Sequence, residues 1–345
     1  MNKIIDRIEL AKKKSFKKYI TFYKSKHWER YNLKAKLYKK SNLFNFRNNQ
    51  LSAGLDDQSD LSNIKEYYLK LKKKIEQRFI IKNLFSKNIG NLKNYSEFYG
   101  KILDFGQLFF IYWLYILKKN IKKINFICEI GSGYAGFAEK IIRNYPKAKY
   151  LIIDLPEANF LSSYFLSKHF PNKKILLAYE KNREEIYKSD FNKYDIIIIP
   201  PWFKVEGIKF DLFINTRSMM EMDKDVIFKY FEFIQSNISE KGYFFNVNRY
   251  FKNTVKRPLK LIDYPYDNNW NTLISQPSFQ QKHIRILLTQ RSKNPKKSIL
   301  KELKKLKKIT EKYFLKENRN KISFYKNIYY LLKRKIYLGY EYLRN

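Results

Sequence analysis

The chain has 345 residues, 44% of them hydrophobic, which is enough to bury a core in one large domain or two ordinary ones. Its formal net charge of +39 is typical of chains that bind polyanions such as nucleic acid or anionic lipid. Lys, Asn, Ile, Tyr and Phe are all abundant and have A- and T-rich codons, so we favour a genomic bias over a dedicated polyanion site.

Residues 1–100 are predicted to form a helical accessory region that covers the substrate. Residues 1–40 contain 14 Lys or Arg against 3 acidic residues, and no apolar run among them resembles a secretion signal. Residues 42–60 are predicted to form loops, because they are rich in Asn, Gly, Asp and Ser. A helix is predicted to begin near Leu61, because apolar side chains recur at helical spacing: Ile64, Tyr67, Tyr68, Leu71 and Ile75.

From residue 102 onward, short apolar segments alternate with amphipathic ones. Residues 102–117 are fewer than the ~20 that a bilayer helix needs and include Asp104 and Gln107, so they predict a buried helix. Seven later runs are too short for helices and predict strands: 124–130, 150–153, 175–179, 195–199, 210–215, 243–247 and 284–289. This alternation is typical of an α/β domain of the Rossmann type, which we predict over residues 101–292 with a mainly parallel, seven-stranded sheet flanked by helices.

The first of these strands leads into a glycine-rich turn that is followed by an amphipathic helix. Glycines let the backbone approach a ligand and adopt tight turns, and the N–H groups at the helix start then face that ligand. The residues predicted to bind a nucleotide-type cofactor are Gly131, Ser132, Gly133 and Gly136. The single cysteine, Cys128, lies in the same strand and excludes a disulfide within the chain, which fits a reducing, cytoplasmic location.

Two acidic residues specify which cofactor this turn favours. Asp154 ends the next strand, 23 residues after Gly131, where a carboxylate can accept hydrogen bonds from ribose hydroxyls. Asp154 could instead cap the next helix; we favour ribose binding, with Leu155 beside the cofactor. Glu129 suits a cationic amino acid tail better than a pyrophosphate. The pattern Glu129-x-Gly131-x-Gly133 resembles the first motif of S-adenosylmethionine-dependent methyltransferases.

Two later strands are predicted to add to the site at the carboxyl edge of the sheet. The strand at 195–199 precedes Pro200 and Pro201, after which Trp202 or Phe203 either covers the adenine or forms a structural corner. The strand at 210–215 brings four polar residues to the edge where ligands of open α/β folds bind. We predict that Asn215 contacts the cofactor, whereas Arg217 and Ser218 contact the substrate, and we consider Glu221 below.

Residues 293–345 are predicted to form a Lys-rich helical extension. Its leucines recur every third residue, and 18 Lys or Arg stand against 4 acidic residues between positions 291 and 345. Two interpretations stay open: a solvated helix that packs its leucines on the domain, which we favour, or a basic surface in peripheral contact with the anionic inner membrane.

Together these segments resemble a bacterial family of sugar O-methyltransferases, over about residues 95–290 and three N-terminal pieces, HWER, NLFNFR and GLDD. The resemblance implies S-adenosyl-L-methionine as the donor and a sugar hydroxyl of a surface polysaccharide or its precursor as the acceptor. The sugar is inherited from the family and comes from no residue of this chain. The sequence leaves the oligomeric state open.

Methyl transfer to a hydroxyl needs a positioned acceptor and a base. Glu221 is the candidate base, with ion pairing or capping in the next helix as the equal alternative. His283 precedes the last strand and is a second catalytic candidate, His27 would need the N-terminal region to fold over the pocket, and His169 is predicted to lie in a surface loop. No convincing metal-ligand spacing is present, so we expect a metal-independent reaction.

Two rival functions remain open. A nucleic-acid methyltransferase would account for the basic flanks and the many aromatic residues. Against it, PPWF is preceded by Ile199 and lies on the strand before the one that carries the Pro-Pro-aromatic motif in amino methyltransferases. The other rival is a non-catalytic subunit that has kept the cofactor-binding fold.

Overall fold

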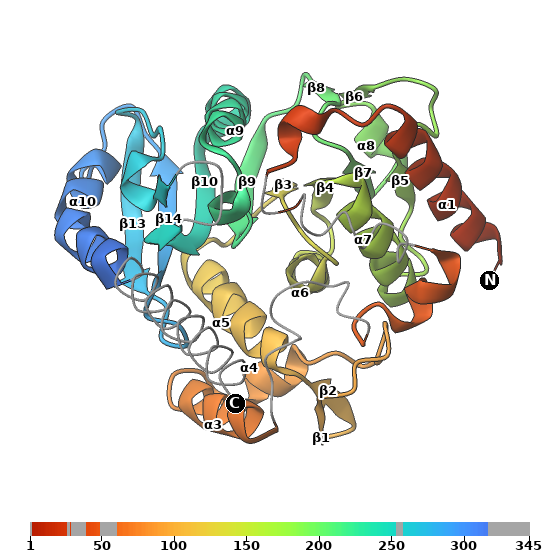
Figure 1. Cartoon of the computed structure of the whole chain (residues 1–345), viewed down its shortest axis with the longest axis horizontal. Helices are drawn as coiled ribbons and strands as arrows, with labels where there is room; N and C mark the ends of the chain where they lie inside the picture. The colour runs from red at the N-terminus through yellow and green to blue at the C-terminus, as the bar shows by residue number, and fades with distance from the viewer. Residues whose placement is uncertain (1, 26–27, 29–38, 49–60, 253–257, 317–345) are drawn as a thin grey trace, which may run out of the picture.

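A central sheet with helices on both faces dominates the computed structural model, which describes residues 2–25, 28, 39–48, 61–252 and 258–316 (Figure 1). Within these residues the sheet has eight strands in the order β5-β7-β4-β3-β9-β10-β14-β13. Its strands are β3 Phe126–Ile130, β4 Lys149–Ile153, β5 Ile175–Leu177, β7 Ile196–Ile199, β9 Phe210–Thr216, β10 Ile238–Arg249, β13 Trp270–Pro277 and β14 Ile284–Arg291. Neighbours from β5 to β10 pair in parallel, whereas β14 is antiparallel to both of its neighbours.

The predicted Rossmann-type α/β class is confirmed, and all seven predicted runs form strands of the sheet. The predicted number of seven strands is wrong, because no apolar run in the sequence marks β13. In this edge strand only Trp270 and Thr272 are buried, and the other residues are half-buried or exposed. Polar residues such as Ser275 and Gln276 interrupt it, so it has no continuous apolar run.

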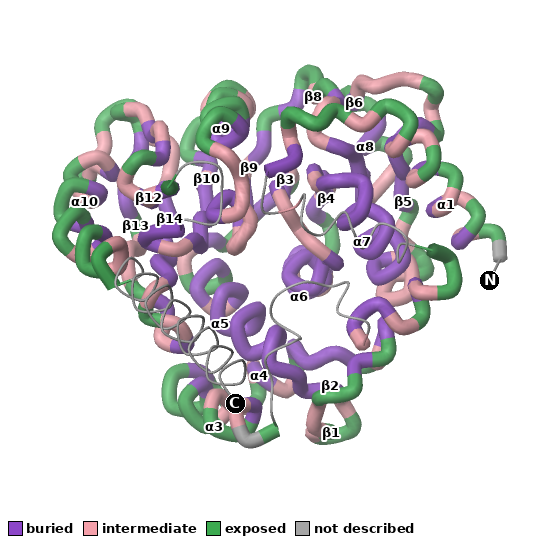
Figure 2. Tube along the Cα trace, viewed as in Figure 1, coloured by how far each residue is buried: buried purple, intermediate pink, exposed green. Residues whose placement is uncertain are grey.

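Successive strand residues point to opposite faces of the sheet and build two cores. On one face, residues such as Ile127 and Ile214 belong to a core with α5 Phe105–Asn120, α6 Gly136–Asn144 and α7 Pro156–His169. On the other face, residues such as Cys128 and Phe213 belong to a core with α8 Asp190–Lys193, α9 Lys224–Asn237 and α10 Ile299–Lys305. Figure 2 shows the buried strands and helices at the centre and the exposed surfaces of α3 and α10 outside them. Helix α5 confirms the predicted buried helix.

The order of the strands determines where a ligand can bind. Along the chain, β3, β4 and β7 are added in one direction, and β9 and β10 in the other, so the order reverses between β3 and β9. Ligands of open α/β sheets bind outside the carboxyl ends of the strands at such a switch point. The loops after β3 and β9 occupy this position.

The N-terminal region adds small elements around this domain. They are α1 Asn2–Lys17, η1 Thr21–Tyr23, η3 Lys40–Asn45, α3 Leu61–Lys72, α4 Gln77–Lys82, β1 Ser96–Phe98 and β2 Lys101–Leu103. The helix predicted near Leu61 is confirmed by α3. Ile5 and Ile64 belong to the same core as α5. The domain boundaries at residues 100 and 292 stay predictions.

Short elements also follow the central strands. They are β6 Glu185–Tyr187, β8 Lys204–Glu206, η5 Met219–Glu221, β11 Phe251–Lys252, β12 Leu259–Lys260 and η6 Leu261–Asp263. In the C-terminal extension, Leu303 and Leu306 are buried and pack on the domain, whereas Leu315 is exposed. Contact with an anionic membrane stays a prediction. Among the described residues, no helix has both the length and the apolar character needed to cross a bilayer.

Candidate active site

The loop after β3 is in tight contact with the loop after β9. Gly131 has φ +75°, and a Cβ added to it would lie 1.8 Å from the Oγ of Ser218. The hydroxyl of Ser218 donates to the carbonyl of Ile130 over 3.2 Å. Only glycine fits between these two loops, so the spacing between β3 and β9 requires Gly131. Ser218 contributes to this contact, and its predicted role toward a substrate stays a prediction.

Gly133 faces open space at the switch point. Its φ is +58°, and an added Cβ would meet nothing within 4 Å. Its N–H donates to Oδ2 of Asp154 over 2.8 Å, which joins the first loop to the end of β4. The hydroxyl of Ser132 beside it has no hydrogen-bond partner among the described residues. We call the open space beside Gly133 the cradle.

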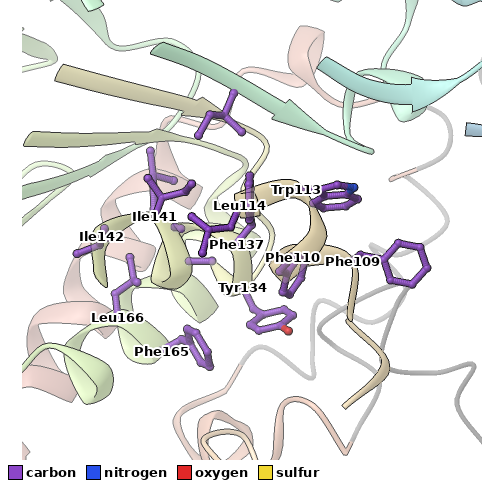
Figure 3. Close-up of a cluster of buried hydrophobic side chains, with 14 of the residues drawn as sticks. Phe109, Phe110, Trp113, Leu114, Tyr134, Phe137, Ile141, Ile142, Phe165 and Leu166 are labelled. Atoms are coloured by element: carbon purple, nitrogen blue, oxygen red, sulfur yellow. The ribbon is translucent and has the colours of Figure 1, made fainter. Parts of the chain in front are cut away.

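Tyr134 and Gly136 pack the loop after β3 against aromatic side chains of α5 and α7. The buried Tyr134 ring lies 5.1 Å from that of Phe165 and 6.4 Å from that of Phe110, measured between centroids (Figure 3). A Cβ on Gly136 would lie 2.6 Å from the Phe110 ring. Gly136 therefore lets α6 pack closely against α5, and its predicted contact with the cofactor stays a prediction.

Asp154 joins the end of β4 to the loop after β3, and its predicted contact with ribose stays a prediction. Its Oδ1 accepts a hydrogen bond of 2.7 Å from the N–H of Leu155, where α7 begins, while Oδ2 accepts the Gly133 N–H. Burial raises the pKa of this carboxyl to about 7, although both N–H groups oppose the rise. Carboxylate oxygens accept more than one hydrogen bond each, so these two bonds leave room for a ribose hydroxyl.

Glu129 lies beneath the loop, fully buried. Its Oε2 accepts a hydrogen bond of 2.8 Å from the hydroxyl of Tyr150, and its Oε1 has no hydrogen-bond partner among the described residues. Burial raises the pKa of Glu129 to about 8, against the effect of Tyr150. A positive charge at the loop would favour the ionised form, so this carboxyl responds to the charge of a ligand.

A substitution at Glu129 tests this burial. A carboxyl whose pKa is raised on folding stabilises the fold at low pH, and that stability is lost as the pH rises through the folded pKa. The free energy of unfolding of Glu129→Gln, relative to the natural chain, is therefore expected to increase by about 3.5 kcal/mol between pH 5 and pH 8. Urea denaturation across this range measures it. Exposed Glu232→Gln is the control, and parallel pH profiles for all three proteins would contradict the prediction.

Asn215 ties the β9 loop to the β3 loop from inside the protein. It is fully buried, and its Nδ2 donates to the carbonyl of Ile130 and to Oγ of Ser218, each over 2.8 Å. Its Oδ1 accepts from the N–H of Met219 and from the side chain of Asn248. Asn215 thus shapes both loops, and its predicted contact with the cofactor stays a prediction.

An N-terminal segment, residues 19–25, lies along the carboxyl edge of the sheet, as Figure 1 shows for the chain after α1. Trp202 donates from Nε1 to the hydroxyl of Tyr179 over 2.8 Å, and its ring lies 5.6 Å from that of Tyr19. Lys24 pairs with Glu157 of α7 over 3.2 Å. The predicted role of Trp202 toward adenine stays a prediction.

The same segment reaches the far side of the switch point. The ring of Tyr23 lies 6.1 Å from that of Tyr230 in α9, and the hydroxyl of Ser25 donates to the backbone carbonyl of Glu221. These residues were missed in the sequence, where no motif marks them. His27, two residues further, lies outside the described residues.

The predicted catalytic and substrate residues come together at one corner of the sheet. Arg217 has φ +65°, and its Nη1 donates to Oε1 of Gln281 over 2.6 Å. Oε1 of Glu221 lies 3.5 Å from Nζ of Lys252. His283 and Arg217 interact electrostatically, and burial together with nearby cations lowers the pKa of His283 to about 4. The imidazole is therefore neutral at pH 7.

The prediction for His169 is wrong. Its side chain is 1% exposed, at the end of α7, and its ring lies 4.4 Å from that of Phe165. Aromatic neighbours from a distant segment, including Phe85 at 5.3 Å, cover it. The polar residues around His169 in the sequence predict a loop, because the covering residues are far away along the chain.

No protein-family model and no curated protein matches the chain. Among solved structures, the chain is similar to the pyocyanin biosynthetic protein PhzM, with 9% identity, 54% of this chain and 58% of that chain covered, and a TM-score of 0.35. The chain is also similar to the mitomycin 7-O-methyltransferase MmcR, with 11% identity, 54% of this chain and 55% of that chain covered, and a TM-score of 0.37. A third similar structure is the N-methyltransferase NodS from Bradyrhizobium japonicum, in complex with S-adenosyl-L-homocysteine. Its identity is 10%, the alignment covers 52% of this chain and 83% of that chain, and the TM-score is 0.37.

The chain spans less than two thirds of the length of PhzM and of MmcR. Likeness at this level carries no argument about function. The fold assignment rests on the order and direction of the strands themselves.

Proposed function

We propose that this chain is an S-adenosylmethionine-dependent O-methyltransferase that methylates a sugar hydroxyl of a surface polysaccharide or its precursor. The observation that carries the proposal is the cradle at Gly133. An added Cβ there would meet open space, and the Gly133 N–H is bound to Asp154 at the switch point of the sheet. A nucleoside can approach the backbone closely only at such a place.

The residues around the cradle fit this donor. Asp154 has lone pairs left for ribose hydroxyls, and Ser132 has a hydroxyl without a partner among the described residues. Glu129 provides a carboxyl whose ionisation a cationic sulfonium or ammonium group would favour. Trp202 offers an aromatic surface, partly exposed, at the end of β7. Bound S-adenosylmethionine would supply an electrophilic methyl group.

The chain's own task is then to position an acceptor oxygen and remove its proton. Glu221 lies three residues after Ser218, which contacts the loop after β3, residues 131–135, here called the cofactor loop. The Glu221 side chain is 21% exposed. We assign Glu221 as the base. His283 is the second candidate: Nε2 of its neutral imidazole has no hydrogen-bond partner among the described residues, so it can accept a proton.

Two substitutions separate binding from transfer. Asp154→Ala is expected to weaken S-adenosylmethionine binding about 10- to 100-fold, because hydrogen bonds to a charged group are lost. Glu221→Ala is expected to keep the affinity within about twofold and to slow methyl transfer at least about 100-fold. Isothermal titration calorimetry and transfer of a labelled methyl group measure the two effects. Equal loss of binding in both variants would refute this division of roles.

The acceptor needs its own experiment. The purified chain with labelled S-adenosylmethionine is offered glycans, nucleotide sugars and RNA, and we expect label in the sugar-containing acceptors. Label in RNA alone would favour the nucleic-acid methyltransferase. Cofactor binding with no transfer to any acceptor would favour the non-catalytic subunit, and absence of cofactor binding would refute the proposal as a whole.

A further inference from the structure

Basic side chains from four segments of the chain, next to β9, β10, β11 and β14, lie at the corner where β9, β10 and β14 meet. Arg217 follows β9, and its N–H donates to the carbonyl of Val247 in β10 over 2.7 Å. Arg249 ends β10, Lys252 lies in β11, and the carbonyl of His283, just before β14, accepts the N–H of Tyr250 over 3.1 Å. We call Arg217, Arg249, Lys252 and His283 the basic corner.

Within the described part of the chain, Arg217 and Lys252 together carry more positive charge than the one acid that acts on both of them. Among the described residues, Glu221 is the acid that acts on both Arg217 and Lys252, and it lies 3.5 Å from the Lys252 ammonium group. The Lys252 side chain is only 8% exposed. Burial, with repulsion from Arg249 and Arg217, lowers the pKa of Lys252, and burial with repulsion from Arg249 lowers that of Arg217 to about 10. Holding like charges together in a partly buried place is costly unless an anion joins them.

The basic corner lies beside the cofactor loop. Arg217 immediately precedes Ser218, whose Oγ occupies the space that a Cβ on Gly131 would need. Arg217, Glu221 and His283 are each partly exposed, so the corner reaches the surface of the protein. A group bound at the corner would hold the rest of its molecule next to the cradle at Gly133.

We propose that the basic corner binds the phosphate of a phosphorylated sugar acceptor and thereby orients the sugar toward the methyl donor. This inference rests on the proposed function and specifies its substrate class. A guanidinium group offers a fork of donors to phosphate oxygens, and an ammonium group adds a point charge. A phosphate carries about two negative charges at neutral pH, which matches two cations better than a neutral sugar does.

Calorimetry with pyrophosphate tests the site, in the presence of saturating S-adenosyl-L-homocysteine. We expect Arg217→Gln and Lys252→Gln each to weaken pyrophosphate binding about 10-fold or more, because a charge-assisted contact is lost. Lys305→Gln is the matched control: its side chain is 76% exposed on α10, and its affinity should stay within about twofold of the natural value. Arg217→Lys should restore part of the binding.

The natural chain supplies an independent readout through His283. Arg249, Arg217, Lys316 and Lys252 all act on this imidazole and hold its pKa low, together with burial. A bound phosphate offsets these charges, so saturating pyrophosphate is expected to raise the pKa of His283 by at least about one unit. The chain has three histidines, so proton NMR of their ring resonances, assigned with His283→Gln, follows the shift. The buried His169 is the internal control.

The outcomes separate this inference from the proposed function. Binding of S-adenosylmethionine without any binding of pyrophosphate would overturn the phosphate site and leave the methyltransferase proposal intact. Pyrophosphate binding that neither Arg217→Gln nor Lys252→Gln weakens, with no shift at His283, would also overturn it. Tight, salt-sensitive binding of a short RNA that Arg217→Gln abolishes, without pyrophosphate binding, would assign the basic corner to nucleic acid instead. Faster methylation of a sugar phosphate than of the free sugar, lost in Lys252→Gln, would support the proposal.

Discussion

Gly131→Ala is expected to abolish cofactor binding and to lower the free energy of unfolding by about 3 kcal/mol or more. Its added Cβ would lie 1.8 Å from Oγ and 2.3 Å from Cβ of Ser218, a contact that neither loop can relieve without moving. The backbone there also has φ +75°, which costs an alanine about 1 kcal/mol. Urea denaturation and titration with S-adenosylmethionine measure the two effects.

Two other glycines separate the clash from the backbone strain. Gly207→Ala places an alanine at φ +68° with nothing within 4 Å, on an exposed turn before β9, so it should cost about 1 kcal/mol and leave cofactor binding unchanged. Gly133 resembles Gly207, because its φ is +58° and an added Cβ would also meet open space, but at Gly133 this space is the proposed cradle. We expect Gly133→Ala to be about as stable as Gly207→Ala and to lose cofactor binding. Cofactor binding by Gly133→Ala at the natural affinity would place the cofactor elsewhere.

Asp104→Ala is expected to destabilise the fold by about 3–5 kcal/mol, because it leaves a buried guanidinium group without its carboxylate. Asp104 pairs with Arg47 over 2.9 Å, and both side chains are at most 1% exposed. The same carboxylate caps α5 by accepting the N–H of Gln107 over 2.9 Å. Asp104→Asn keeps a capping oxygen but not the charge, so it should lower the free energy of unfolding less than Asp104→Ala does. Thermal and urea denaturation measure both.

The control for this ion pair is an exposed one. Asp6 lies 2.9 Å from Lys40, with side chains 63% and 49% exposed, so Asp6→Ala should cost less than about 1 kcal/mol. Arg47 also lies 5.2 Å from the Tyr134 ring, beneath the cofactor loop. Asp104→Ala should therefore weaken cofactor binding as well, and equal stability of the Asp104 and Asp6 variants would contradict the structural role of the buried pair.

The sequence predicted the α/β class and seven of the eight strands, because buried parallel strands require continuous apolar runs that are visible without the fold. The glycine-rich turn was equally visible, since the positive φ values of Gly131 and Gly133 limit which residues can occupy them. The sequence could not distinguish a residue that faces a ligand from one that faces another loop. Asn215 shows this: its position after β9 fits a ligand site, but all its described hydrogen bonds are made inside the protein.

The sequence by itself determined the local conformation of the cofactor loop, because turn geometry and strand burial depend on neighbouring residues. The tertiary structure alone decided what surrounds that loop. The contact of Ser25 with Glu221 joins residues 196 positions apart, and the basic corner assembles from residues in or next to four strands, β9, β10, β11 and β14. Such contacts follow from strand order and from the path of the N-terminal segment, which depend on how all the buried surfaces fit together and have no signature in a short stretch of sequence.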